Sequence, residues 1–229
     1  MALDGYGPLV LVGLLTTIEL AVLSIAGAFF VGIVGASCKL SSRRSLRLAA
    51  TVYTTVIRSV PDLVMMLLLF YSLQMWLNGV TDRLGLHQID IDPFAAGAIT
   101  LSFIYGAYFT ETFRGAFQAV PRGQLEAAAA YGMTPWKTFC RILFPQMMRH
   151  ALPGIGNNWQ VMIKATALVS LIGLNDLIKV TQDAGKASSS FFFFSILSAA
   201  IFLGLATATN VVVFMLERYF STGVRRVGA

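Results

Sequence analysis

Long runs of apolar residues, separated by short polar stretches, set the pattern of the chain. The runs reach about 18 residues or more without paired charges, which is the length that a helix needs to cross about 30 Å of hydrocarbon. The pattern predicts five transmembrane helices, at 9–37, 60–77, 94–113, 152–172 and 191–216, placed to within a few residues. We therefore expect an all-α integral membrane protein that forms one domain over residues 1–229.

The composition excludes a soluble enzyme. Of the 229 residues, 56% are hydrophobic and 12% are charged, whereas a soluble domain carries roughly 25% charged residues. The net charge of +6 would indicate a nucleic-acid partner only if the basic residues gathered on a soluble face, and here they lie in short loops between apolar runs. Cys38 and Cys140 stand alone, without a CxxC or histidine spacing, so we expect no metal site.

The Lys and Arg residues predict the orientation of the chain, because cytoplasmic loops retain positive charge. One side collects Lys39, Arg43, Arg44, Arg47, Arg58, Arg114, Arg122, Lys137, Arg141, Arg149, Arg218, Arg225 and Arg226. The other side holds only Arg83, Lys179 and Lys186. We expect a periplasmic N-terminus and a cytoplasmic C-terminus. Residues 1–8 contain no basic segment, which favours a retained first span over a cleaved signal peptide.

The odd number of spans and the absence of an internal repeat point to a second chain. Many transporters form their path between two repeats of one chain, and no segment recurs here. Two rows of small residues at every fourth position allow helices to approach closely. They are Ser24, Ala28, Gly32 and Ala36 in the first span, and Ala200, Gly204 and Ala208 in the last. Packing within the chain and packing between subunits both fit these rows.

A long, partly apolar segment, 117–150, lies between the third and fourth predicted spans and is far longer than usual connections between packed helices. Residues 124–131 favour a helix by propensity, and Gly132 can supply the left-handed residue that ends it. Pro135 suits the first turn of a second helix, and Pro145 is expected to stop that helix. The residues alone are compatible with docking into a protein groove or with lying on the membrane surface.

The spacing of this segment resembles a known family motif. Glu126-Ala127-Ala128, then Gly132 four residues on and Pro145 thirteen residues further, are similar to the EAA loop in permease subunits of bacterial ATP-binding cassette (ABC) importers. The resemblance implies that this loop fits a cleft on an ATP-hydrolysing subunit and couples its motion to the membrane helices. Glu126, Ala127, Ala128, Gly132 and Pro145 are then the coupling residues.

The resemblance extends over essentially the whole chain. The segments 58–62, 105–115, 151–160 and 168–173 resemble the polar amino-acid uptake branch, above all its Q-type permease subunits for histidine, lysine, arginine and ornithine. This implies a type I importer fold, a homologous sister permease, two ATP-binding subunits and a periplasmic binding protein. The chain contains no G-x-x-x-x-G-K-[ST] phosphate loop. We therefore expect no catalytic residue and no cofactor in this chain, with ATP and magnesium bound by the partner subunits.

Ionisable residues inside predicted spans are functional candidates, because a charge at bilayer depth costs about 2.5 to 3.5 kcal/mol on insertion scales. Glu19 lies about ten residues, or roughly 15 Å, into the first span, and we favour a role in the substrate path over an internal ion pair. Asp62 follows Pro61 and either faces the same path or pairs with Arg58 on the helix surface. Two carboxylates in the path would favour substrates with cationic side chains.

The other candidates for the path are Tyr105, Tyr108, Glu111 and Lys164. Glu111 and Arg114 are three residues apart and can pair as a gate or a structural lock. Lys164 could attract a substrate carboxylate or pair with Glu111. Tyr105 and Tyr108 share a helix face, where they either line the path or pack in the core.

The sequence thus predicts a permease subunit that moves histidine, arginine, lysine or ornithine across the bacterial inner membrane by alternating access. One alternative is the same machinery carrying an opine or another polar amino acid. A second alternative is a channel or carrier that works without ATP.

Overall fold

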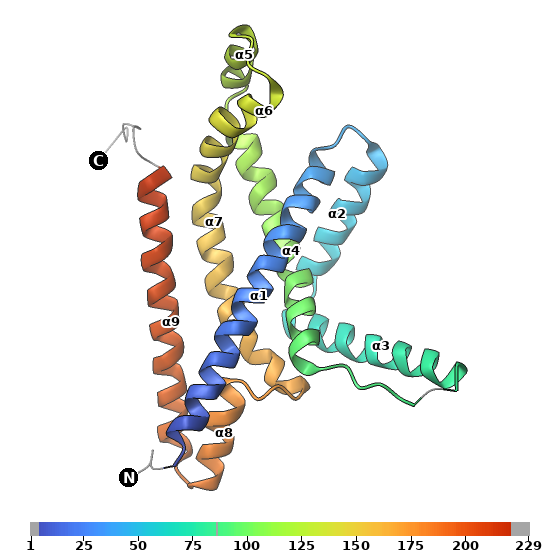
Figure 1. Cartoon of the computed structure of the whole chain (residues 1–229), viewed down its shortest axis with the longest axis vertical. Coiled ribbons are helices and arrows are strands. Elements are labelled where there is room, and N and C mark those ends of the chain that lie inside the picture. Colours follow the sequence, from blue (N-terminus) through green and yellow to red (C-terminus); the bar gives the residue numbers. More distant parts are fainter. Residues whose placement is uncertain (1–4, 86, 221–229) are drawn as a thin grey trace.

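The computed structural model describes residues 5–85 and 87–220, and the described part of the chain is helical without strands (Figure 1). Its elements follow in the order α1 (Gly7–Leu40), α2 (Arg44–Ser59), α3 (Asp62–Arg83), α4 (Pro93–Ala119), α5 (Arg122–Ala130), α6 (Pro135–Thr138), the π-helical turn η1 (Phe139–Leu143), α7 (Phe144–Ala165), the 3₁₀ segment η2 (Thr166–Ile172), α8 (Leu177–Ala187) and α9 (Phe191–Phe220). The basic residues Arg225 and Arg226, which entered the orientation argument, lie outside the described residues.

Helices α1 and α4 form the centre of the fold. The small residues Ser24, Ala28, Gly32 and Ala36 are buried on α1, and a Cβ atom added at Gly32 would lie 2.5 Å from the Cβ of Phe109 on α4. The first row of small residues therefore packs within the chain. In the second row, Ala200, Gly204 and Ala208 are all exposed on α9, so that row remains available for another subunit.

Helix α2 was missing from the sequence prediction, which treated residues 38–59 as a loop. Ala50, Thr54 and Ile57 recur at helical spacing and form its buried face. The polar residues of α2 lower its apolar content below that of a transmembrane span, so the sequence analysis assigned the segment to a loop. Because Arg58 lies fourteen residues after the start of α2, it stands roughly 21 Å along the helix from Arg44. Assigning Arg58 to the basic cluster at the α1–α2 connection was therefore wrong.

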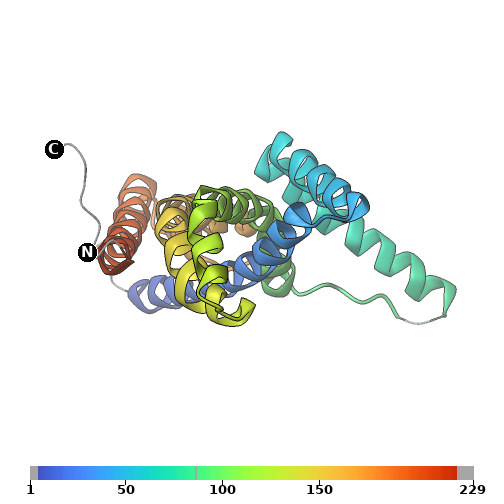
Figure 2. The same cartoon turned by 90° about the horizontal axis from the view of Figure 1, so that it is seen from above.

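The predicted five spans are not confirmed. Among the described residues, α1, α3 and α9 are each long and apolar enough to cross a membrane, and 135–172 with α8 would make a fourth span if that bent pair counts as one. Helix α3 runs at a steep angle to α1, α4, α7 and α9 after the chain turns at Pro61 (Figures 1 and 2). Helix α4 is not in this apolar group, and its many buried positions fit its place at the centre of the fold.

The fourth predicted span is longer and more broken than expected. Pro153 lies inside α7, and the 3₁₀ segment η2 ends at Gly173, whose φ of 104° is left-handed. Asp176 then caps α8 by accepting a 2.9 Å hydrogen bond from the Lys179 N–H. The backbone N–H of Leu177, the first residue of α8, donates a 3.1 Å hydrogen bond to the Thr17 hydroxyl of α1. This hydrogen bond attaches the start of α8 to the N-terminal half of α1.

Candidate functional site

The coupling loop, which we define as residues 117–150, projects beyond the other helices at one end of the molecule (Figure 1). Its first helix, α5, ends at Ala130, and Gly132 follows with a left-handed φ of 67°. Thr134 caps α6, and Pro135 occupies its first turn, as the sequence predicted. The bend between the two helices is thus held by residues with a strong local preference for it.

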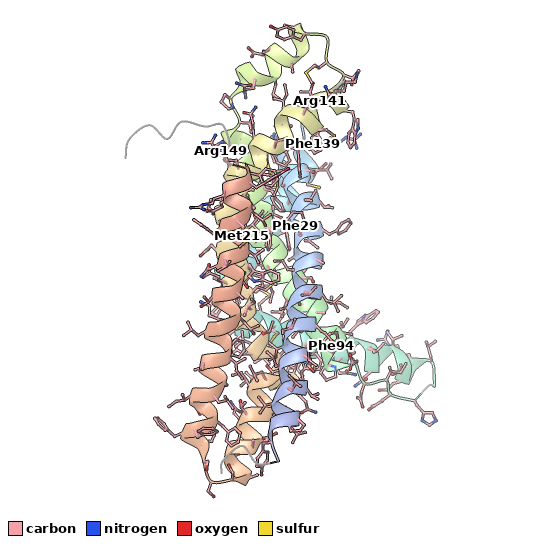
Figure 3. All side chains as sticks on the ribbon, turned by 60° about the vertical axis from the view of Figure 1, so that its left-hand side comes forward. Phe29, Phe94, Phe139, Arg141, Arg149 and Met215 are labelled. Carbon is pink, nitrogen blue, oxygen red and sulfur yellow. The ribbon has the colours of Figure 1, made fainter. Side chains whose placement is uncertain are left out.

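The prediction that Pro145 would stop the second helix is wrong. The π-helical turn η1 joins α6 to α7, and Pro145 lies in the first turn of α7. A proline is tolerated in the first turn of a helix, because the N–H group that it lacks would have no partner within that helix. The coupling loop is therefore continuous with a helix that runs deep into the fold. In Figure 3, Phe139 and Arg141 lie at the end that carries α5, far from Phe94 near the start of α4.

The residues of the EAA motif, 126–128, lie partly on an exposed face and partly on a packed face of α5. Glu126 and Ala127 are exposed, whereas Ala128 is buried. Two aromatic residues that the sequence analysis did not select are also exposed, Tyr131 at 88% and Trp136 at 73%. Their position in the sequence, close to the bend at Gly132, could have identified Tyr131 and Trp136 as candidates. The loop thus presents a carboxylate and two large aromatic side chains on a surface that nothing in the single chain covers.

A second group of candidates meets where α2 turns into α3 beside α4. The Tyr105 hydroxyl donates a 2.8 Å hydrogen bond to Asp62 Oδ2, and the rings of Tyr105 and Tyr108 stack with centroids 5.5 Å apart. The guanidinium carbon of Arg58 lies 5.3 Å from the Tyr108 ring centroid, within cation–π distance. We call Arg58, Asp62, Tyr105 and Tyr108 the Asp62 cluster. From the sequence, Arg58 was considered as a basic loop residue and as a pairing partner of Asp62, but not as a site residue, because α2 was not recognised.

The exposure of these four residues places the cluster partly at an open surface. Tyr105 is buried, at 1% exposure, and is part of the hydrophobic core. Asp62 and Tyr108 are half-buried, and Arg58 is exposed. A guanidinium therefore lies over the Tyr108 ring, and a carboxylate is held by the Tyr105 hydroxyl, so a cation and a carboxylate both lie beside the two stacked phenol rings. This arrangement can contact both charges of an amino acid.

Glu111 forms an ion-pair network at the far end of α4. It pairs with Lys39 of α1 and accepts a 2.9 Å hydrogen bond from Arg114 Nε. The side chains of Lys39 and Glu111 are 9% and 19% exposed, so this pair is largely shielded from solvent, whereas the Arg114 side chain is 36% exposed. Glu111 is paired as predicted with Arg114, but its second partner is Lys39 and not Lys164. Lys39 is seventy-two residues away in the sequence, and local spacing could not reveal it.

Glu19 and Lys164 do not join either group. Both side chains are exposed in the single chain. Glu19 lies on the same face of α1 as the exposed Leu15 and Leu23, one turn away on either side. Its surroundings on this helix face are apolar, so a carboxylate at this position needs cover from another subunit or from water.

The chain resembles known transport proteins over almost its full length. It is 58% identical over 224 residues to the histidine/lysine/arginine/ornithine transport system permease protein HisQ of Salmonella typhimurium, covering 98% of both chains. It is 37% identical over 223 residues to the nopaline transport system permease protein NocQ of Agrobacterium fabrum, covering 96% of this chain and 94% of that one.

The fold is also that of a solved transporter. A chain from the crystal structure of an amino acid ABC transporter with histidines is 32% identical, covers 95% of this chain and 96% of its own length, and superposes with a TM-score of 0.79. Such permease subunits work in membrane assemblies with partner subunits and have no ATPase site of their own. Residues 28–226 match the family of binding-protein-dependent transport system inner membrane components. The chain belongs to this family and is an inner-membrane permease subunit of an amino-acid ABC importer.

Proposed function

We propose that this permease subunit carries the cationic amino acids histidine, arginine, lysine and ornithine into the bacterial cytoplasm by alternating access. The full-length similarity to HisQ supports this substrate class. The assembly would contain a homologous sister permease, two ATP-binding subunits that hold ATP and magnesium, and a periplasmic binding protein. The positive charge of the predicted cytoplasmic loops supports a periplasmic N-terminus and a cytoplasmic C-terminus.

The observation that carries the substrate proposal is the Asp62 cluster. An amino acid with a cationic side chain offers two positive groups and one carboxylate. Asp62 can accept hydrogen bonds from a positive group, and Arg58 can bind the carboxylate. The half-buried Tyr108 ring, over which Arg58 lies, can hold that guanidinium in place for the carboxylate. We place Glu19, Glu111 and Lys164 along the same path, with Glu19 and Lys164 facing a space shared with the sister permease.

The coupling loop would connect ATP hydrolysis to these helices. Glu126, Ala127 and Gly132 lie at its exposed tip, and Ala128 and Pro145 fix its attachment to the rest of the chain. Because η1 continues directly into α7, a displacement of the loop would be passed to a helix that packs against both α4 and α9. This continuity supports a lever-like role for 117–150.

The substrate proposal can be tested in the complete assembly, reconstituted in liposomes with its binding protein. We expect arginine to stimulate ATP hydrolysis and to be taken up, and Asp62→Asn to raise the arginine KM about tenfold, as expected when one charged hydrogen bond is lost. The parallel variant Glu19→Gln tests the second carboxylate. Unchanged arginine uptake in both variants would remove the argument for a cationic path.

Two outcomes would favour the alternatives. Uptake of octopine, nopaline or a neutral polar amino acid, but not of arginine or lysine, would indicate the same machinery with another substrate. Uptake by the purified chain alone, without ATP, would indicate a channel or carrier. Co-purification from the native membrane would identify the companion subunits.

A further inference from the structure

The packing of α7 against α9 has one apolar side and one polar side. The two helices meet closely where Gly156 contacts Val213, and Trp159 Nε1 donates a 2.7 Å hydrogen bond to the Thr209 hydroxyl. Toward α1, a cavity of about 370 Å³ is lined by apolar residues such as Ile155, Ile163 and Leu205. The other side of the same helix pair carries a groove of very different chemistry.

We call this the α7–α9 groove. It has a volume of about 410 Å³, within the range of small-molecule sites. Its polar lining consists of Asn157, Gln160, Asn210 and Glu217, with Pro153 and Phe214 as apolar walls. Positions 153, 157 and 160 recur at helical spacing on α7, and 210, 214 and 217 do so on α9. The two polar helix faces thus converge on one concave surface.

Such a surface is costly inside a membrane. An amide or carboxylate that faces hydrocarbon loses its hydrogen bonds to water, so polar groups within transmembrane helices usually face protein or an aqueous cavity. Gln160 Nε2 donates to Asn210 Oδ1, which uses only one polar group of each amide. The Gln160 carbonyl oxygen and the Asn210 amino group remain suitable for a ligand.

Glu217 supplies the charge of the groove. It is half-buried on α9, one turn before the helix ends. Within residues 5–85 and 87–220, Glu217 forms no ion pair. The neighbouring ring of Phe214 already receives a guanidinium, because the Arg218 guanidinium carbon lies 4.6 Å from its centroid. The Glu217 carboxylate and the Gln160 carbonyl oxygen together form a surface suited to a cationic head group.

We propose that the α7–α9 groove binds the guanidinium or ammonium head of a transported amino acid, as a second subsite separate from the Asp62 cluster. This inference rests on the proposed function. The C-terminal end of α9 lies toward the same end of the molecule as the coupling loop (Figure 1), so the groove would lie on the inward side of the path.

The test uses the whole assembly in lipid nanodiscs, without binding protein or nucleotide, and measures equilibrium binding of radiolabelled arginine and citrulline. Citrulline has nearly the shape of arginine but carries a neutral head group. We expect Glu217→Gln to weaken arginine binding about tenfold and to leave citrulline binding unchanged. The control Asp183→Asn removes an exposed carboxylate on α8 and should change neither affinity.

Each other outcome overturns the inference. Unchanged arginine affinity in Glu217→Gln would exclude contact with the cationic head, and an equal loss for both ligands would indicate a general structural effect. Loss of the sister permease from the purified variant would show that Glu217 instead holds the other chain. If the wild-type assembly transports arginine while Glu217→Gln behaves like wild type, only the groove proposal fails. If the wild type neither binds nor transports cationic amino acids, the proposed function fails with it.

Discussion

Tyr105 donates a 2.8 Å hydrogen bond to Asp62, and this contact joins the centre of α4 to the first turn of α3. Tyr105 is fully enclosed, whereas Asp62 is half-buried. The bond therefore satisfies a buried hydroxyl and also fixes the direction of a carboxylate that stands at an open surface. One interaction serves both the fold and the candidate substrate site.

Replacing Tyr105 by Phe removes only the hydroxyl. We expect the arginine KM in the reconstituted assembly to rise about fivefold, because the freed Asp62 side chain must be ordered again when substrate binds, at a cost of about 1 kcal/mol. The maximal ATPase rate should change less. The measurement is the arginine dependence of ATP hydrolysis in proteoliposomes.

Tyr53 provides a matched control. Its hydroxyl donates a 2.5 Å hydrogen bond to the carbonyl oxygen of Phe103, joining α2 to α4 without involving Asp62. Tyr53→Phe should lower thermal stability about as much as Tyr105→Phe does, because each variant loses one hydroxyl hydrogen bond. It should leave the arginine KM unchanged. Equal KM values in the two variants would mean that the Tyr105 hydroxyl has no role in substrate binding.

The Glu111 network should contribute more to stability than a surface ion pair. Glu111→Gln would leave the ammonium of Lys39, in a side chain only 9% exposed, without its carboxylate. We expect a loss of about 1–3 kcal/mol in unfolding free energy, since an unpaired charge in a shielded site is costly. Thermal unfolding of the detergent-solubilised assembly measures this effect.

An exposed pair gives the comparison. Asp183 pairs with Lys179 at 3.5 Å, and both side chains are more than one third exposed. Asp183→Asn should change stability by less than about 0.5 kcal/mol. If the two carboxylate variants have the same melting temperature, the Glu111 network is not a lock between α1 and α4.

The sequence predicted best those features that depend on neighbouring residues. The bend of the coupling loop followed from Gly132 and Pro135, because each has a local backbone preference that the structure retains. Helix α2 was missed because its apolar positions cover only one face, and the search was for long apolar runs. Amphipathic helices need a search for periodicity as well as for apolar length.

The contacts within the sites were less accessible to sequence reasoning. Tyr105 and Asp62 were both selected as candidates, but their hydrogen bond depends on how the chain turns at Pro61. The pair of Lys39 and Glu111 likewise depends on the packing of α1 against α4. Charge and depth identify candidate residues, whereas the identity of their partners is a property of the tertiary fold.

The bend of the coupling loop can be tested at Gly132. Its φ of 67° is a conformation that costs an L-residue about 1 kcal/mol or more. Gly132→Ala should reposition the tip of the loop and reduce arginine-stimulated ATP hydrolysis several-fold in the assembly. Binding of the ATPase subunits, measured by co-purification, should weaken in parallel.

Gly123→Ala is the control for this substitution. Gly123 lies in α5, and a Cβ atom there would meet nothing within 4 Å. Alanine also has the higher helix propensity. This variant should therefore keep both coupling and ATPase binding, and a loss equal to that of Gly132→Ala would show that the bend is not the important feature.

The two rows of small residues should respond differently to an added methyl group. At Gly32 the new Cβ would lie 2.5 Å from the Cβ of Phe109 and 3.1 Å from its carbonyl carbon. The backbone of α4 cannot move away without disturbing the core. We expect Gly32→Ala to destabilise the chain by about 1–3 kcal/mol, seen as a lower melting temperature and a lower yield in detergent.

At Gly204 a new Cβ would meet nothing within 4 Å in the single chain, so Gly204→Ala should leave its stability unchanged. Co-purification of the sister permease with the wild type and with Gly204→Ala then tests whether the outer face of α9 contacts that subunit. If Gly204→Ala weakens co-purification of the sister permease while the chain itself stays stable, that row packs between subunits, because close helix approach in membranes depends on small residues. If assembly is also unchanged, the exposed row at Ala200, Gly204 and Ala208 faces lipid.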